Sequence, residues 1–173
     1  TDRAQLEAQH QQVDPRFLFV VPGYNLRPTE ITGAFGIQQV RRLADFVARR
    51  NANHSRWCAA VDSLNLPLRV FPQRPGTTHA GFAFPMLLDE GGPVDRATLC
   101  ARLAEHKVDS RPISGSNLSR QPAFDRMNDV RVEGPLLVAN AVHERGLFVG
   151  QSHAFDDRHL DLLCRALRSA FDR

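Results

Sequence analysis

The stretch that decides the fold is GYNLRPTE at residues 23–30, followed by GAFG at residues 33–36. Its first residues are typical of a turn, because glycine and asparagine tolerate the backbone angles that turns require. Pro28 suits the first position of a helix, and Glu30 lies in the first turn, where the helix dipole favours negative charge. The sequence therefore predicts that a helix starts at this point.

Apolar residues recur at helical spacing after this start, while arginine and aspartate occupy the opposite face. The apolar positions are Ile31, Ala34, Phe35, Ile37, Val40, Leu43, Ala44 and Val47. Trp57 and Val61 continue the stripe, so we expect one helix from about Pro28 to about Leu64. This is longer than the usual helix of about 8 to 20 residues. Because long helices often join two domains, we expect an apolar surface on it that another domain or subunit covers.

Downstream of this helix the pattern changes to short extended pieces separated by helices. We predict strands at residues 68–71, 80–88, 108–113 and 146–150, and helices at residues 95–106, 135–145 and 156–171, the last of them capped by Asp156. The predicted fold class is α+β, with a long helix followed by a small, mainly antiparallel sheet packed with helices.

Three segments are expected along the chain. Residues 1–22 form a polar lead with a short strand at residues 17–21, residues 23–66 form the long interdomain helix segment, and residues 67–173 form a small C-terminal domain. The start at Thr1, without a methionine, suggests a fragment boundary.

Composition limits the classes of function. The 173 residues carry 22 Lys+Arg against 19 Asp+Glu, a net charge of only +3 with both signs intermixed, which argues against nucleic-acid binding. The longest apolar run is about five residues, far short of the roughly 18 that a membrane span needs. Cys58, Cys100 and Cys164 match neither zinc spacing nor a disulfide framework. We therefore expect a cytoplasmic protein with reduced thiols and no bound metal.

Three further segments accompany the opening stretch in order: HAGFAFP at residues 79–85, RPISGSNLSRQPAF at residues 111–124 and GLFVG at residues 146–150. Together they resemble the C-terminal half of the DegT-type sugar aminotransferases and the related sugar 3-dehydrases. The resemblance implies a fold type I enzyme of the aspartate aminotransferase superfamily. Such enzymes are dimers that use pyridoxal phosphate (PLP), and their C-terminal region closes over a nucleotide sugar.

The resemblance also assigns cofactor-binding residues. In the family, the asparagine of the Gly-Tyr-Asn turn reaches the cofactor phosphate of the partner subunit, a role that matches Asn25. Arg27 can add a permanently charged planar group for a phosphate. The residues alone favour the alternative, in which Asn25 is a turn residue and Arg27 a solvated surface arginine.

Substrate contacts are expected from residues 111–124, which resemble the substrate loop of the dehydrase-like branch. Asn117 would bind sugar hydroxyls, and Arg111 and Arg120 would meet the negative charge of the diphosphate. The alternative is a polar loop with solvated arginines. His79 is a further candidate substrate ligand, although a histidine at the start of a strand more often serves packing or capping.

The sequence departs from the family pattern at the catalytic group. Its single lysine, Lys107, follows a predicted helix and lacks the serine- and glycine-rich surroundings of a Schiff-base lysine. We therefore expect the chain alone to be inactive and to bind PLP weakly or not at all. The three separated cysteines do not supply the cluster of the iron–sulfur dehydrases. Ala80 stands where relatives commonly place tryptophan.

The implied parent enzyme aminates a 4-keto or 3-keto deoxysugar carried on a nucleotide, with an amino donor such as glutamate, in deoxysugar or lipopolysaccharide biosynthesis. The main alternative is a non-catalytic module that dimerises or binds a nucleotide sugar. A sugar 3-dehydrase is less favoured, and so is a serine hydrolase built on residues 150–154, which nearly match G-x-S-x-G.

Overall fold

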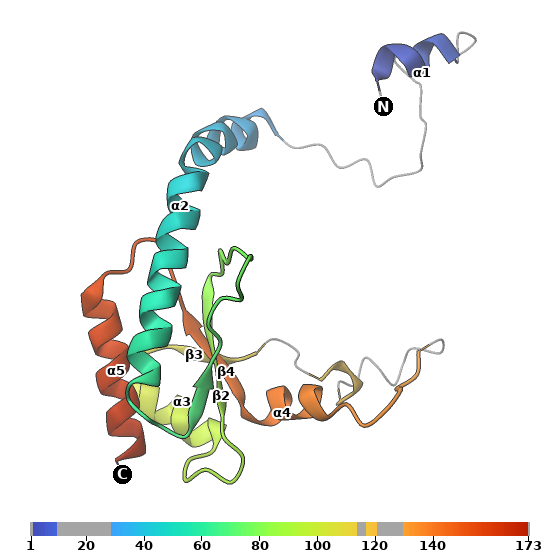
Figure 1. Ribbon diagram of the computed structural model, residues 1–173. Coiled ribbons are helices and arrows are strands. Elements are labelled where there is room, and N and C mark those ends of the chain that lie inside the picture. Colours follow the sequence, from blue (N-terminus) through green and yellow to red (C-terminus); the bar gives the residue numbers. More distant parts are fainter. Residues whose placement is uncertain (1, 10–28, 114–116, 121–129, 173) are drawn as a thin grey trace. The chain divides into compact units, whose positions relative to one another are not determined.

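The computed structural model describes residues 2–9, 29–113, 117–120 and 130–172 (Figure 1). Its contacts divide the chain into two compact units, residues 1–41 and residues 42–173. The predicted strand at residues 17–21 lies outside the described residues.

The first unit contains a short helix, α1 (Arg3–Gln9), and the beginning of the long helix α2 (Glu30–Asp62). The carboxylate of Asp2 caps α1 by accepting a hydrogen bond from the Ala4 N–H at 3.1 Å. The sequence predicted a polar lead at these residues, so α1 was missed. Its seven residues are too few for a clear apolar period.

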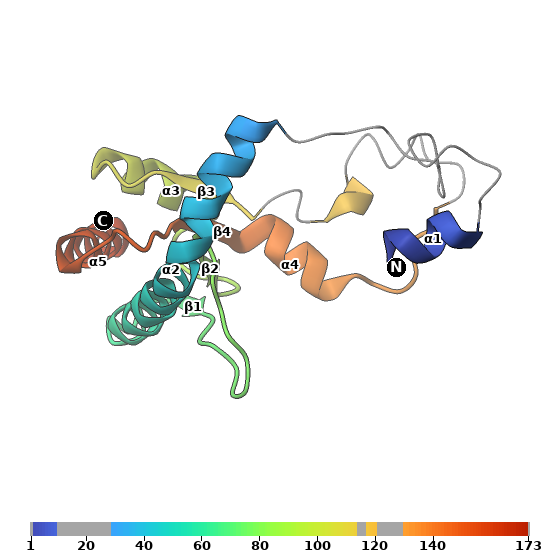
Figure 2. The ribbon, with the colours of Figure 1, turned by 90° about the horizontal axis from the view of Figure 1, so that it is seen from above.

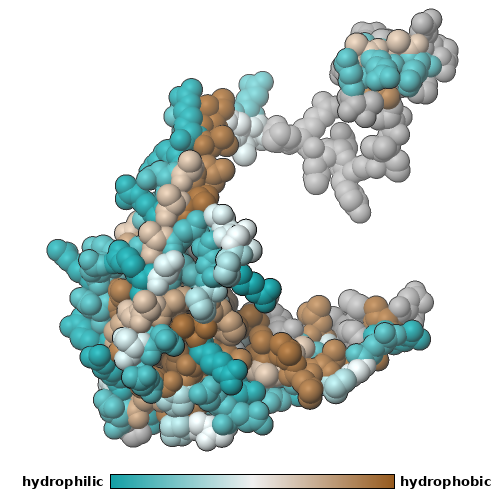
Figure 3. Space-filling view, viewed as in Figure 1, coloured by the Kyte–Doolittle hydropathy of each residue, from teal (hydrophilic) through white to brown (hydrophobic). Residues whose placement is uncertain are grey.

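Helix α2 has 33 residues and confirms the predicted long helix within two residues at each end. Its first turn is capped by Thr29, whose Oγ1 accepts from the Thr32 N–H at 3.3 Å. Ile31, Phe35 and Val40 are each about 70% exposed. Figure 3 shows exposed apolar atoms over the first turns of α2. The expected exposed apolar surface is therefore present.

The second unit is built on a four-stranded antiparallel sheet. The strands are β1 (Leu68–Val70), β2 (Ala83–Leu88), β3 (Ser110–Pro112) and β4 (Gly146–Gly150), in the order β1-β2-β4-β3. The β2–β4 register places Phe84 opposite Val149 and Met86 opposite Leu147. All four of these side chains are buried, so they define the core face of the sheet.

Helices cover both faces of this sheet, as the two ribbon views agree (Figures 1 and 2). Helices α3 (Arg96–Glu105) and α5 (Asp157–Phe171) lie on the core face with the later turns of α2, and α4 (Leu137–Arg145) lies on the opposite side. Leu99, Leu103, Leu163 and Leu167 join Trp57 and Val61 in the core. The α+β class is thereby confirmed.

Local capping explains where the helices of the second unit begin. Asp95 accepts from the Thr98 N–H at 2.7 Å at the start of α3. At the start of α5, Asp156 and His159 form a reciprocal capping box, so the predicted cap at Asp156 is confirmed. Like α1, the 3₁₀ turn η2 (Leu118–Arg120) was not predicted; it lies within the expected polar loop.

Candidate functional site

The candidate substrate loop is anchored to α4 through Asn117. Although it belongs to a loop, Asn117 is only 3% exposed. Its Nδ2 donates to Asn140 Oδ1 at 2.7 Å, and its Oδ1 accepts from both the N–H and the hydroxyl of Ser119, at 3.0 and 2.7 Å. The amide oxygen and one Nδ2 hydrogen are therefore engaged, and among the described residues the second Nδ2 hydrogen has no partner.

A second anchor joins the same loop to the same helix. Arg120 Nη1 lies 2.9 Å from Glu144 Oε1, in a half-exposed ion pair. Asn140 and Glu144 are four residues apart, so they share one face of α4. The structure thus brings Asn117 and Arg120 together on that face. An anionic ligand of Arg120 would have to compete with the Glu144 carboxylate.

The remaining predicted residues lie elsewhere. Arg111 is exposed on the edge strand β3, with its Nε 3.8 Å from Asp109 Oδ2. Within the described ranges, no hydrogen bond or ion pair joins Arg111 to Asn117 or Arg120. Asn25 and Arg27 lie outside the described residues.

His79 packs against another histidine. Its ring stacks on His54 with centroids 4.2 Å apart, and its Nδ1 accepts from the Gly81 N–H at 3.2 Å. Burial, and secondarily His54, lower the pKa of His79 below its ordinary value. A neutral ring is therefore favoured, as packing requires, while the role of His79 as a substrate ligand stays a prediction.

His54 and Cys58, which lie beside His79, were not among the residues predicted from the sequence. His54 is buried on α2, its Nε2 lies 2.8 Å from the Phe71 carbonyl oxygen, and Cys58 Sγ lies 3.5 Å from the same nitrogen. Because a carbonyl only accepts, Nε2 carries the proton and cannot take one from the thiol. The spacing of four residues on one helix was the available signal.

The thiol of Cys58 is consequently not activated. Burial, reinforced by the charge of Asp62, raises the pKa of Cys58 to about 11. Activated cysteines have the opposite shift, because a neighbouring cation stabilises their thiolate. The His54–Cys58 pair therefore serves packing in the core and is not a nucleophile with its base.

The hydrolase alternative also loses its geometry. Residues 150–154 leave an antiparallel strand, whereas the nucleophile elbow requires a strand-to-helix turn on a parallel-rich sheet. Ser152 Oγ accepts from the Ala154 N–H at 3.2 Å, and the Ser152 carbonyl oxygen accepts from Asn53 Nδ2 at 3.0 Å. Ser152 thus shapes the turn that leads to α5.

The described residues do not form a PLP site by themselves. Lys107, the single lysine, lies at a cavity of about 240 Å³ whose lining includes no arginine that could bind the cofactor phosphate. Among the described residues no cluster of three or more metal-ligating side chains occurs. No helix in the described part of the chain is long and apolar enough to cross a membrane.

The environment of Cys58 predicts that its thiol reacts more slowly than the other two thiols of the chain. With a pKa of about 11, only about one Cys58 thiol in a thousand is ionised near pH 8, and the side chain is buried. Cys100 and Cys164 are half-buried, and burial also raises the pKa of Cys164. We expect an alkylating reagent to add two labels to the folded chain, the one at Cys164 more slowly, and the third only on unfolding, as read from the intact mass. Cys58→Ser should abolish this third event alone. Rapid addition of three labels to the folded wild-type chain would contradict the assignment.

Comparison with known proteins gives the family. The model of the DegT/DnrJ/EryC1/StrS aminotransferase family matches residues 3–168. A GDP-4-keto-6-deoxy-D-mannose 3-dehydratase of Yersinia pseudotuberculosis is 33% identical over 149 residues, which cover 84% of this chain and 37% of that protein. The chain therefore spans about two fifths of the length of the curated relatives it matches.

Solved structures give the same fold. A crystal structure of GDP-4-keto-6-deoxymannose-3-dehydratase with a trapped PLP-glutamate geminal diamine superposes with a TM-score of 0.78 at 28% identity, over 89% of this chain and 39% of that one. An aminotransferase of the same family from Brucella abortus has a TM-score of 0.77 at 19% identity, over 95% and 41%. At that identity it supports the fold alone. The chain belongs to the DegT/DnrJ/EryC1/StrS aminotransferase family, a PLP-dependent family of fold type I.

Proposed function

We propose that this chain is the C-terminal part of a cytoplasmic, PLP-dependent 3-dehydratase and that it closes over the substrate. The substrate would be a nucleotide-linked 4-keto-6-deoxy sugar. The observation that carries the proposal is the 33% identity, over most of the chain, to a protein named GDP-4-keto-6-deoxy-D-mannose 3-dehydratase. The sequence motifs alone favoured amination over dehydration. We reverse that order because the aminotransferase structures at 19–22% identity support only the fold.

The loop that contains Asn117 and Arg120, which is anchored to α4, suits a contact with a sugar diphosphate. Arg120 presents a guanidinium that is half-exposed and held by Glu144, and a diphosphate offers it a stronger, bidentate partner. Asn117 positions the loop through Asn140 and keeps one N–H for a sugar hydroxyl. Arg111, exposed on β3, adds a second cation for the nucleotide end.

The cofactor itself requires residues beyond those described. When bound, PLP withdraws electrons from the carbon next to the nitrogen it holds. Asn25 and Arg27 are proposed to hold its phosphate across a homodimer interface, as the family resemblance implies. The described residues provide neither the covalent attachment nor a base for it, so the catalytic group must come from another part of the enzyme.

Two other functions remain candidates. Amination with glutamate as donor is favoured by the family model, which matches nearly the whole chain. A non-catalytic nucleotide-sugar-binding module is the other candidate, because the cavity beside Lys107, the single lysine, has no arginine in its lining that could bind the PLP phosphate. Both share the fold with the dehydratase, so the reaction must be distinguished by its product.

The product of the intact polypeptide that contains this chain decides among these functions. We expect GDP-4-keto-6-deoxy-D-mannose, supplied with PLP and glutamate, to yield a sugar nucleotide that has lost one oxygen, as measured by mass spectrometry. A product that gains an amine would establish the aminotransferase. Absence of turnover, with binding of the nucleotide sugar retained, would establish the module.

The ion pair on α4 predicts opposite effects of two substitutions on nucleotide-sugar binding. Arg120→Gln removes the cation, and it should weaken binding by about 1.5–3 kcal/mol, the value of a hydrogen bond to a charged group. Glu144→Gln removes the competing carboxylate while it keeps a hydrogen-bonding side chain. It should leave binding unchanged or tighter. Calorimetric titration of each variant with the nucleotide sugar measures both affinities. Equal losses of affinity in the two variants would show that the ion pair only anchors the loop.

The assignment of Asn25 is tested with hybrid dimers of the intact enzyme. One subunit carries Asn25→Ala and the other lacks the catalytic group that acts on PLP. Because Asn25 is proposed to act across the interface, the hybrid should contain one complete site and regain activity. Hybrids as inactive as either parent homodimer would place Asn25 in its own subunit's site or in the turn alone.

A further inference from the structure

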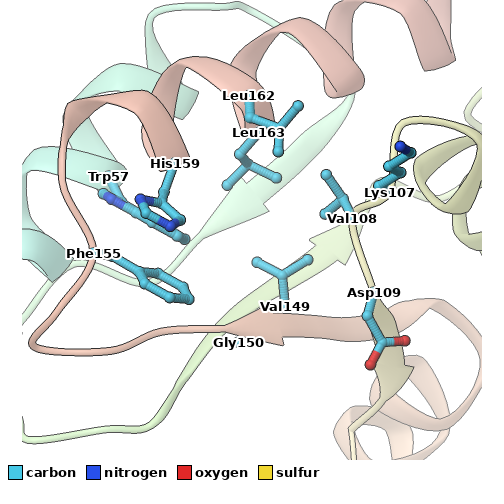
Figure 4. A pocket seen from close by; sticks show the side chains of 10 residues that line it. All are labelled: Trp57, Lys107, Val108, Asp109, Val149, Gly150, Phe155, His159, Leu162 and Leu163. Carbon is cyan, nitrogen blue, oxygen red and sulfur yellow. The ribbon is translucent and has the colours of Figure 1, made fainter.

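A cavity of about 240 Å³ lies in the second unit, between α5, the end of β4 and the segment before β3 (Figure 4). One wall consists of three aromatic rings. Trp57 stacks on Phe155 with centroids 6.0 Å apart, and Phe155 stacks on His159 at 4.4 Å with an interplanar angle of 6°. The facing wall is aliphatic and includes Val108, Val149 and Leu163.

The position of Lys107 at this cavity is fixed by the backbone. Lys107 follows His106, the C-cap of α3, and has a φ of 60°, the left-handed region that favours glycine. Its N–H donates to the Ala104 carbonyl at 2.9 Å and the Val108 N–H donates to the Leu103 carbonyl at 3.0 Å, which together form a Schellman motif. A lysine, the only one in the chain, thus occupies a position where glycine is the ordinary choice.

Lys107 is accompanied by an opposite charge at the same cavity. Asp109 also lines it; its side chain is 84% exposed and forms an ion pair with Arg111, whose Nε lies 3.8 Å from Asp109 Oδ2, so a bound ammonium would compete with Arg111. No ion pair holds the Lys107 ammonium within the described part of the chain. The cavity therefore combines apolar walls with one cation and one anion that are two residues apart.

We propose that this cavity binds a free α-amino acid with an apolar or aromatic side chain. The side chain lies between the ring wall and the aliphatic wall, the α-carboxylate pairs with Lys107, and the α-ammonium pairs with Asp109. The volume equals that of about eight waters at roughly 30 Å³ each, which suits a leucine or phenylalanine side chain. Asn117 and Arg120 do not line this cavity, so it is separate from the loop anchored to α4, although its Asp109 pairs with Arg111.

The chain contains its own probe for this site. Trp57 is the single tryptophan and lines the cavity, so its fluorescence reports occupancy. Titration of the 173-residue chain with L-leucine and L-phenylalanine should give saturable emission changes with Kd of about 1 mM or tighter. 3-Phenylpropionate lacks the ammonium and phenethylamine lacks the carboxylate. Each should bind about tenfold more weakly than L-phenylalanine, because one charge stays unpaired.

Substitution of Lys107 separates binding from stability. Lys107→Gly should weaken amino-acid binding about tenfold and leave the urea midpoint unchanged or higher, since glycine suits the left-handed position. Asp109→Asn should weaken L-phenylalanine binding but not 3-phenylpropionate binding. Arg74→Gln, which removes a cation remote from the lining residues, is the matched control and should bind like wild type.

Three results would overturn the proposal. They are the absence of a saturable Trp57 response to either amino acid, equal affinity for L-phenylalanine and its two truncated analogues, and unchanged affinity in Lys107→Gly. The second result would indicate a gap that accepts any apolar molecule.

Discussion

The absence of a side chain at Gly146 is the constraint on which the second unit depends. Helix α4 ends at Arg145 and the central strand β4 begins at the next residue, so the chain turns from helix to strand without a loop. A Cβ at Gly146 would lie 2.5 Å from the Val142 carbonyl oxygen and 3.0 Å from Ile113 Cδ1. Any other residue would push α4 away from the sheet or shift β4 in its register.

The junction at Gly146 affects both the strand that follows it and the helix that precedes it. On the strand side, the register of β4 places Leu147 and Val149 on the core face opposite Met86 and Phe84. On the helix side, Arg145 donates to the Leu88 carbonyl at 3.1 Å, and Arg96 donates to the carbonyl of His143. These contacts fix α4 to the body of the unit. The loop that contains Asn117 and Arg120 is therefore held on a rigid helix, as a substrate contact requires.

The sequence predicted the elements well because their signals are local. The period of apolar residues gave α2 within two residues at each end, and Asp156 marked the start of α5 through its capping chemistry. The sheet was also expected, although its strand order was not. Helix α1 was missed because seven residues hold too little periodicity.

The site was less predictable because its contacts join residues far apart in sequence. Asn117 meets Asn140 across 23 residues, and the His54–His79 stack joins α2 to the segment before β2. Neither contact can be recognised from the local spacing of residues in the sequence. Asn117 was chosen for its amide and its family position, but the sequence could not show that its oxygen is taken by Ser119. The sequence showed that residue 117 carries an amide, but not which atoms of that amide are free to bind a ligand.

Proteins with this fold are named for different reactions, so structural similarity alone does not determine which reaction is catalysed. A named 3-dehydratase at 28% identity and an aminotransferase at 19% superpose on this chain almost equally well, with TM-scores of 0.78 and 0.77. The backbone frame shared by the two classes therefore cannot select between loss of oxygen and gain of nitrogen. We infer that selection lies in the group that moves the proton next to the cofactor; the one lysine of this chain is instead held at an apolar cavity after α3. Under the proposed function, the chain would contribute the substrate side of the site, through a loop held by Asn140 and Glu144 on a helix that Gly146 joins directly to β4.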